Sequence, residues 1–585
     1  MNLFMRSDQR SGADSSRFFT DEPPRPPLAC LAEIAPDYAL VQEFRPLSLS
    51  LAAQVASAHW SRRGTAAFAE EQVPYAVTSD GHLSSCAAGV MFVHCEEMPP
   101  AADITVLELG AGSGLFARFF LDVFRDLCRR EGRDYYERLT YFVTDGSEAT
   151  VRQWHAQAVF SDHAEHVRAG VCNAAGGAIE IDGVCVEPLQ LRAVFANYVL
   201  DILPTAILRR SPSGVVEELC SRVWVNRKSA ALQRHGLDEQ GVCALFSDAS
   251  EAAQERLERL LPELTVETAF LECLHPPGYA DQALALVPPQ APGYSSHGAL
   301  DALAFWQGRL LPGGFILLAD YGPLTPDEIE PTGLDRFGPT VAAGLNFALL
   351  DSVTRTAGWH PHAPPGDAEL PIHPRLIVDR ELPQTVACFK ELYDGQRFRE
   401  VEMLLAQARS AAHSGRLDEA SQYYRLVVES RQTDWRLLGE VADFAHFQLR
   451  KPHIALELIR SALALNPCYS AALWNTYGDS LFDCGRPQDA HEAFLVAQRI
   501  HPSDVRAKYG LVFTYAHQCR HADALAAVAA ALAIDRDGAY RERLLGKQRE
   551  ILDAAAADWE RTARTAPHNL PSAAMAGAAT DRQAA

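Results

Sequence analysis

An apolar segment, a glycine-rich loop and a helical segment follow one another between residues 104 and 127 of this 585-residue chain. The run ITVLEL (104–109) is typical of a buried strand, and LFARFFLDVFRDL (115–127) is typical of a helix. The loop GAGSG (110–114) between them lets the backbone approach a ligand closely. A strand, a glycine loop and a helix in this order form the nucleotide-binding half of a doubly wound fold. We therefore expect a ligand beyond the carboxyl end of the strand, at the helix N-terminus.

Apolar runs and helical segments alternate over residues 104–322. Continuous apolar runs separated by helices predict a mostly parallel sheet between helices, an α/β Rossmann-like domain. Residues 36–75 have the apolar spacing of a helix. Residues 270–298 are rich in Pro and Gly and predict a long excursion from the sheet, and such excursions are often functional. The other expected strands are 139–144, 193–200 and 314–320.

After about residue 380 the sequence becomes repetitive. Four alanines align at spacings of 35, 35 and 34 residues, and the helix-ending Pro467 and Pro502 are also 35 residues apart. This period matches the tetratricopeptide repeat of ~34 residues. A helical bundle without true repeats is the alternative interpretation. The aligned alanines are Ala420, Ala455, Ala490 and Ala524, and the residues that fit the first helix of a repeat are Trp474, Tyr477, Gly478 and Leu481.

The length of the chain predicts two or more domains, because one core seldom serves so many residues. Both ends have compositions typical of disordered segments, rich in Ser, Asp, Arg and Pro at the start and in Ala, Ser and Pro at the finish. The predicted division is a disordered lead at 1–35, an α/β domain at 36–385, an all-α tetratricopeptide-repeat domain at 395–560 and a disordered tail at 561–585.

The net charge of −22 opposes nucleic acid as the main partner, because phosphate binding needs a basic face. No apolar run reaches the ~18 residues of a membrane helix, and the first residues lack the apolar stretch of a secretory signal. Thirteen dispersed cysteines without C-x-x-C spacing fit a reducing cytosol. We therefore predict a cytoplasmic protein that contacts neither membrane nor nucleic acid. The sequence does not indicate the oligomeric state.

Two histidine pairs, His163-x-x-His166 and His360-Pro-His362, have the spacing of metal ligands. No further Cys, His or Asp set stands nearby at ligand spacing, so we interpret them as surface histidines and predict no metal site.

The glycine loop and the acid before it favour a cationic ligand over a dinucleotide. A dinucleotide site needs G-x-G-x-x-G, whereas this loop reads G-x-G-x-G. Glu108 would repel a pyrophosphate, but it would attract the ammonium and sulfonium groups of S-adenosylmethionine. Asp145 ends the next strand and is expected to hold the ribose hydroxyls. The alternative, a cap of the following helix, is compatible with that role at a different atom of the turn. We predict S-adenosylmethionine as the cofactor; the alternative is a loop kept only for tight packing.

Several segments together resemble the MidA-like methyltransferases, a family that includes the mitochondrial complex I assembly methyltransferases. LELGAGSG (107–114) resembles the cofactor loop of that family, and DGSEATVRQ (145–153) resembles its acid, Ser and Arg-Gln segment. NYVLDILP (197–204) and LPGGFILLADYG (311–322) are similar to its Asn-Glu-x-x-Asp-x-x-Pro and Asp-Tyr-Gly segments. The predicted cofactor-binding residues are Glu108, Gly110, Ala111, Gly112, Gly114, Asp145 and Ser147.

The resemblance covers roughly residues 70–380, with a looser match at VTSDGHLSS (77–85). It implies a class I S-adenosylmethionine-dependent methyltransferase. Members of the family methylate arginine on a partner protein, so the resemblance implies N-methylation of a protein side chain. Tyr198 stands where the family has Glu, and Asp80-Gly81 stands where it has Pro-Glu. These departures lie near the expected acceptor site and leave the acceptor open.

A guanidinium acceptor needs carboxylates that orient it by paired hydrogen bonds. Asp201 and Asp320 are the candidates, and Asn197 is expected to accept a hydrogen bond from the attacking nitrogen. Tyr198 and Tyr321 are expected to form an aromatic wall for a cation. The alternatives are a turn cap for Asp201 and plain packing for Tyr198. The predicted catalytic residues are Asp201, Asp320, Asn197 and Tyr321, and His82 and His94 are further candidates for a general base.

The repeats are expected to form a superhelix whose concave face binds a partner protein. The leading hypothesis is therefore a protein methyltransferase whose repeats recruit its substrate. A methyltransferase that tailors small molecules or peptides is an alternative. The other is a non-catalytic scaffold that keeps a vestigial cofactor pocket.

Overall fold

The computed structural model describes residues 37–66, 80–98, 103–187, 190–248, 250–260, 264–329, 335–337, 340–342 and 344–565. The predicted disordered lead, most of the predicted tail and the start of the segment 77–85 lie outside these residues. The chain divides into two compact units, the first ending at Thr476 and the second beginning at Tyr477.

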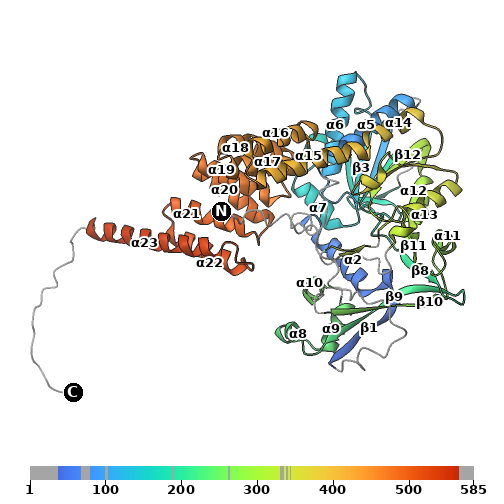
Figure 1. Cartoon of the computed structure of the whole chain (residues 1–585), viewed down its shortest axis with the longest axis horizontal. Helices are drawn as coiled ribbons and strands as arrows, with labels where there is room; N and C mark the ends of the chain where they lie inside the picture. The colour runs from blue at the N-terminus through green and yellow to red at the C-terminus, as the bar shows by residue number, and fades with distance from the viewer. Residues whose placement is uncertain are drawn as a thin grey trace, which may run out of the picture. The chain divides into compact units, whose positions relative to one another are not determined.

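A nine-stranded mixed sheet forms the centre of the first unit (Figure 1). Its order is β15-β16-β12-β7-β2-β3-β4-β5-β6. The five central strands, from β12 to β4, are parallel, as the continuous apolar runs predict, whereas the strands at both edges are antiparallel. The bounds are β2 Ile104–Leu109, β3 Leu139–Asp145, β4 Val167–Val171, β5 Ile179–Ile181, β6 Val184–Val186, β7 Leu191–Asn197, β12 Leu310–Asp320, β15 His360–His362 and β16 His373–Val378.

Helices cover both faces of this sheet. On one face, Leu107 and Leu109 of β2 join a buried cluster with α12 (His297–Gln307) and α13 (Phe347–Thr356). On the other face, Phe195 of β7 lies 5.1 Å, centroid to centroid, from Phe120 of α6 (Leu115–Glu131), which packs beside α5 (His82–Glu97). Burial on both faces explains why the central strands are continuous apolar runs. Two further helices of this unit are α7 Glu148–Ala156 and α14 Pro383–Leu392.

A second, antiparallel sheet was not predicted. Residues 38–46, expected to be helical, form strand β1, which pairs with β9 from Tyr38 opposite Asn226 to Pro46 opposite Cys220. The helix predicted for 36–75 is therefore wrong at its start, whereas α2 at Leu51–Arg63 agrees with it. Pairing with a distant strand has overridden the local pattern. The strands are β1 Tyr38–Pro46, β8 Ala206–Arg210, β9 Val216–Asn226, β10 Leu264–Glu272 and β11 Gly293–Ser295.

The segment 270–298 leaves the nine-stranded sheet, as expected, and its ends belong to this second sheet. The last residues of β10 pair with β9, and β11 pairs with β8. The remaining short elements of this region are α8 Ala230–His235, α9 Glu239–Ser247, α10 Glu251–Leu260, α11 Ala280–Ala285, β13 Asp335–Phe337 and β14 Thr340–Ala342.

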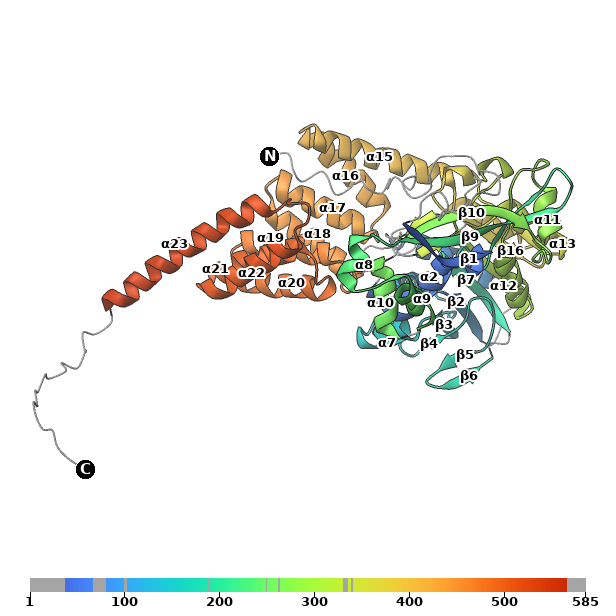
Figure 2. The ribbon, with the colours of Figure 1, turned by 90° about the horizontal axis from the view of Figure 1, so that it is seen from below.

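The rest of the described chain is helical (Figure 2). The four aligned alanines lie in α16, α18, α20 and α22, one in each second helix of a pair, and all four are fully buried. Small buried side chains at this spacing let paired helices pack closely. The bounds are α15 Gly395–His413, α16 Leu417–Ser430, α17 Trp435–Asp443, α18 Pro452–Leu465, α19 Ala471–Asp483, α20 Pro487–Ile500, α21 Val505–His517, α22 His521–Ile534 and α23 Arg541–Thr565. Among the described residues, no helix combines the length and apolar character needed to cross a membrane.

Candidate functional site

The glycine loop follows β2 and leads into α6. Gly110, Gly112 and Gly114 have φ of 61°, 54° and 75°, in the left-handed region that side chains other than glycine rarely adopt. The N–H of Ala111 donates to the carbonyl oxygen of Thr144 at 2.9 Å and ties the loop to the end of β3. The alternation of glycines is thus a requirement of the backbone itself.

Protein side chains press on the loop from two directions. A Cβ at Gly110 would lie 2.6 Å from Val199, which follows β7, and a Cβ at Gly114 would lie 2.8 Å from Phe160. The indole N–H of Trp154 donates to the carbonyl oxygen of Gly112 at 2.9 Å. Close packing alone is therefore a sufficient reason for glycine at positions 110 and 114. This packing role is the alternative to ligand binding that the sequence leaves open.

Asp145 links the end of β3 to the loop. One carboxylate oxygen accepts the N–H of Gly112 at 3.0 Å, and the other accepts the N–H of Ser147 at 2.9 Å. Ser147, and not Asp145, caps α7, because its hydroxyl oxygen accepts the N–H of Thr150. The cap expected as an alternative for Asp145 is therefore wrong. Burial raises the pKa of Asp145 to about 6, and the two N–H donors limit that rise.

Glu108 lies beneath the loop, on the face of the sheet that α6 covers. Its carboxyl is 2% exposed and accepts the hydroxyl of Tyr141 at 3.0 Å. Burial, with a contribution from the negative charge of Asp145, raises the pKa of Glu108 to about 8, although the Tyr141 hydrogen bond opposes the rise. Without a nearby cation this acid is therefore largely protonated at neutral pH.

The predicted catalytic residues meet at the carboxyl ends of β7 and β12. These strands are parallel neighbours with Asn197 opposite Ala319, so the segments that follow them emerge side by side. One carboxylate oxygen of Asp320 accepts the N–H groups of Leu200 and Asp201, at 2.9 and 3.2 Å. The other accepts the N–H of Tyr321 at 2.9 Å. Asp320 thus holds the chain that follows β7 in place.

Asp201 and Asp320 form a buried acid pair, 4% and 0% exposed. Burial and the negative charge of Asp320 raise the pKa of Asp201 well above its usual range. Burial raises the pKa of Asp320 to about 6, against the opposing N–H donors. In the described structure, Oδ1 of Asp201 and Nδ2 of Asn197 are buried without a hydrogen-bond partner. Such atoms are costly unless a ligand satisfies them.

Tyr198 and Tyr321 stack beside the acid pair. Their ring centroids lie 5.9 Å apart with 29° between the planes. Tyr198 has φ of 52°, an unusual conformation for a residue other than glycine, and its N–H donates to Ala319. Strained backbone of this kind costs ~1–3 kcal/mol and clusters at functional sites. The two rings are together, as the predicted aromatic wall requires.

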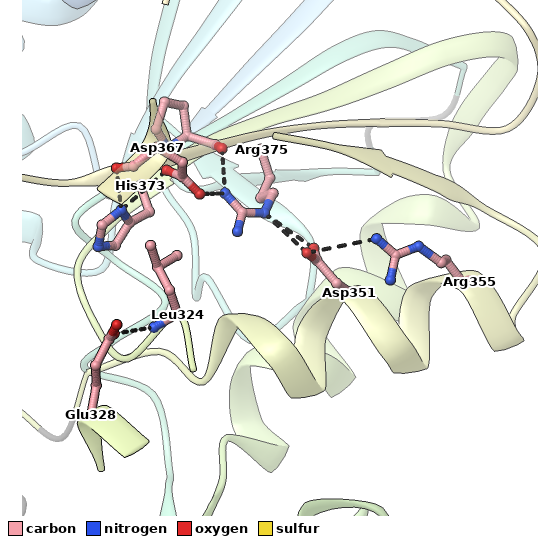
Figure 3. Close-up of polar contacts among 8 residues, drawn as sticks. Leu324, Glu328, Asp351, Arg355, Asp367, His373 and Arg375 are labelled. Carbon is pink, nitrogen blue, oxygen red and sulfur yellow. Dashed lines mark hydrogen bonds and ion pairs between the residues drawn. The ribbon is translucent and has the colours of Figure 1, made fainter. Parts of the chain in front are cut away.

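Sequence reasoning missed His373, which lies opposite Asp320 in the antiparallel register of β16 with β12. Directly opposite residues project to the same face of a sheet. Figure 3 shows that the imidazole of His373 contacts Asp367, which also accepts from Arg375. Arg375 is 3% exposed and bonds to Asp351 as well, so this network fixes the strand beside Asp320. No motif in the sequence marks it.

The histidines singled out from the sequence lie elsewhere. His94 is fully buried against Phe315, with the ring centroids 4.8 Å apart. Phe315 is five residues before the end of β12, so His94 does not lie at the strand ends where Asp201 and Asp320 lie. His163, interpreted as a surface residue, is buried between Tyr136 and Asp122. Within the described ranges, no group of three or more His, Cys, Asp or Glu residues could hold a metal ion.

Residues 87–358, a little under half of the chain, match the model of a family described as "Putative S-adenosyl-L-methionine-dependent methyltransferase". The match includes the glycine loop and the acid pair. It confirms the prediction of an S-adenosylmethionine-dependent methyltransferase with S-adenosylmethionine as its cofactor. A search of curated proteins gave no match.

Three solved structures are similar to parts of the chain. An uncharacterised protein from Burkholderia thailandensis is 16% identical over 55% of this chain and 74% of its own, with a TM-score of 0.35. A member of the same superfamily from that organism, bound to S-adenosyl-homocysteine, is 14% identical over 55% of this chain and 80% of its own, with a TM-score of 0.33. A tetratricopeptide-repeat protein from Thermus thermophilus is 19% identical over 29% of this chain and 93% of its own, with a TM-score of 0.24.

Proposed function

We propose that this protein N-methylates a side chain of a partner protein, arginine in the first place. In this proposal residues 36–385 are the catalytic domain, and the helix pairs of residues 395–560 are tetratricopeptide repeats that recruit the partner. The main support for the proposal is the buried pair of Asp201 and Asp320 next to stacked tyrosines. The pair lies at the carboxyl ends of the parallel strands, where the glycine loop also lies.

The residues around the loop suit S-adenosylmethionine. Both oxygens of Asp145 accept N–H groups, yet each keeps a lone pair that can receive a ribose hydroxyl. The α6 N-terminus offers N–H groups to the carboxylate of the cofactor. Glu108 lies beneath the same loop, where its ionised form would balance the ammonium. The bound cofactor supplies a methyl group on a sulfonium centre, which makes that group open to displacement.

The acid pair fits a cationic acceptor. Two buried carboxylates in contact repel each other, so the pair keeps a proton when no cation is present. A guanidinium between Asp201 and the tyrosines would replace that proton as the compensating positive charge. It would also satisfy the unpartnered Oδ1 of Asp201. Asp320, whose oxygens accept three backbone N–H groups, acts as a positioning residue that holds Asp201.

The helical region suits a recruiting role. Its helix pairs recur at the sequence period, and the alanine of each second helix is fully buried, as stacked repeats require. Stacked pairs present extended surfaces to other proteins. In a cytoplasmic setting, such a surface would raise the local concentration of a protein substrate beside the catalytic domain.

The stacked Tyr198 and Tyr321 favour one other candidate function. Tyr198 stands where the resembled family has Glu, and two stacked rings also suit a flat small molecule or the side chain of a free peptide. A tailoring enzyme would label only small products, whereas a protein methyltransferase would label a protein. A scaffold with a vestigial pocket would bind the cofactor and label neither.

The test incubates the full-length protein with cofactor carrying a labelled methyl group and with lysate proteins, then maps labelled residues by mass spectrometry. We expect label on arginine of a protein. Asp201→Asn should reduce labelling at least 100-fold while cofactor affinity stays within threefold, because Asp201 faces the acceptor. Asp162→Asn, at an exposed position, is the matched control. Label confined to small molecules, or undiminished in Asp201→Asn, would overturn the proposal.

A further inference from the structure

The longest described helix, α23, carries an exposed apolar stripe. Leu545, Leu552 and Trp559 are 40%, 50% and 78% exposed. They are seven residues apart, so they lie on one side of the helix with a drift of only ~20° per step. The exposed Ala556 lies between the last two on the same side. We call Leu545, Leu552, Ala556 and Trp559 the α23 stripe.

The stripe is separate from the face by which α23 packs in its own unit. That face uses Leu544 and Ile551, which are 0% and 2% exposed and belong to a buried cluster with α21 and α22. Each stripe leucine follows a buried residue by one position, which is about 100° around the helix. The α23 stripe therefore takes no part in the buried cluster that α23 forms with α21 and α22.

Spacing by sevens is the pattern of helices that pair with one another. The stripe is symmetric about Leu552, with Leu545 seven residues before it and Trp559 seven residues after it. In an antiparallel pair of α23 helices, Leu552 would face its own copy and each Leu545 would face the Trp559 of the other copy. The small Ala556 would let the two helices approach closely.

The charges of α23 fit the same arrangement. Residues 541–551 carry a net charge of plus two, and residues 553–565, the rest of the helix, carry a net charge of minus one. An antiparallel pair sets each basic half against an acidic half, whereas a parallel pair would set like halves together. The charged residues are Arg541, Glu542, Arg543, Lys547, Arg549 and Glu550 in the first half, and Asp553, Asp558, Glu560, Arg561 and Arg564 in the second.

We propose that the α23 stripe is the interface through which two copies of this chain associate, with their α23 helices antiparallel about Leu552. The observation behind it, an exposed and charge-complementary heptad stripe, is independent of the methyltransferase activity. A homodimer of this kind would present two catalytic domains to one partner.

The test measures the mass of the full-length protein by sedimentation at micromolar concentrations. We expect twice the chain mass of 64.1 kDa for the wild type. Leu552→Asp should shift the protein to monomer and weaken association at least 100-fold, because it sets two like charges at the symmetry centre. Ala557→Asp adds the same charge at an exposed position about 140° around the helix and should leave the dimer intact.

The orientation is tested by disulfide formation, mapped by mass spectrometry. A mixture of Leu545→Cys and Trp559→Cys proteins should yield the 545–559 cross-link between chains, and Leu545→Cys alone should yield none at that position. A monomeric wild type, a dimer that survives Leu552→Asp, or a 545–545 cross-link would each overturn the proposal. The proposal would also be overturned if the protein is a monomer that dimerises only after residues 566–585 are removed. In that case residues 566–585 would bind the α23 stripe.

Discussion

Glu108 holds a proton at neutral pH because it is buried, with a pKa of about 8. If it compensates the ammonium of the cofactor, it must lose that proton on binding. The affinity for S-adenosylmethionine should therefore increase as pH rises toward 8 and level off above it. The expected slope is up to about tenfold per pH unit well below the pKa.

Calorimetry at pH 6.5, 7.5 and 8.5, in buffers with different ionisation enthalpies, measures both the affinity and the proton release. Glu108→Gln should bind more weakly above pH 8 and should lose most of the pH dependence, which leaves only the contribution of Asp145, whose pKa is about 6. An affinity in the wild type that is flat between pH 6.5 and 8.5 would contradict this role of Glu108.

Two glycines distinguish the cost of backbone strain from the cost of close packing. Gly114 and Gly132 both have positive φ, but a Cβ at Gly114 would press on Phe160 while a Cβ at Gly132 meets nothing within 4 Å. Gly132→Ala should lower the free energy of unfolding by ~1 kcal/mol, the cost of the left-handed backbone. Gly114→Ala should lower it by ~2–4 kcal/mol and abolish cofactor binding. If urea unfolding shows the same loss of unfolding free energy for both variants, Phe160 moves aside without cost, which would contradict this prediction.

At the residue scale, the sequence indicated which side chains would gather and missed the state they are in. The ends of adjacent parallel strands predict that Asn197, Asp201 and Asp320 lie close together. The raised pKa values of the two acids depend on burial from all sides, which no local pattern contains. The contact of Val199 with Gly110 and the placement of His373 opposite Asp320 also come only from the assembled sheet.

Helix α6 connects the glycine loop to the helical region of the same unit. The guanidinium of Arg118, in the first turn of α6, donates to the carbonyl oxygens of Ala464 and Leu465 at 2.9 and 3.2 Å. These are the last carbonyls of α18, where a positive charge is worth ~0.3–1 kcal/mol. Arg118 is thus both a helix cap and a link between the two parts.

Removal of this cap should loosen α18 without affecting the loop. Arg118→Met should raise amide hydrogen exchange in residues 460–466 several-fold, because the final turn of α18 opens more often. Arg129→Met, on the exposed side of the same α6, is the control and should leave exchange unchanged. Unchanged exchange in Arg118→Met would mean that the cap contributes nothing to α18.

Elements with strong local patterns were predictable, and elements that depend on distant partners were not. The strands at 104–109, 139–144 and 314–320 are confirmed because burial on both faces makes them continuously apolar. The run predicted at 193–200 ends as a strand at Asn197, where Tyr198 turns into the left-handed region. Strand β1 escaped prediction because its partner β9 is about 180 residues away.

At the scale of the whole molecule, the sequence separates an α/β part from a helical part, and the structure shows both kinds of architecture. The compact units divide at residues 476 and 477, so helices α15 to α18 belong with the mixed sheet. Composition could not indicate this division, because it depends on which helix faces are buried against which neighbours. The hydrogen bonds of Arg118 to α18 are contacts within the first unit.

Titration calorimetry of the full-length protein with S-adenosylmethionine shows whether the loop at 110–114 binds the cofactor for methyl transfer. We expect one cofactor per chain for the wild type, and no binding for Gly112→Arg, whose side chain would fill the space over the loop. Far-ultraviolet circular dichroism should show that the variant keeps its fold. A wild type that binds no cofactor, or a folded Gly112→Arg that binds it as tightly as the wild type, would show that this loop is not the cofactor site.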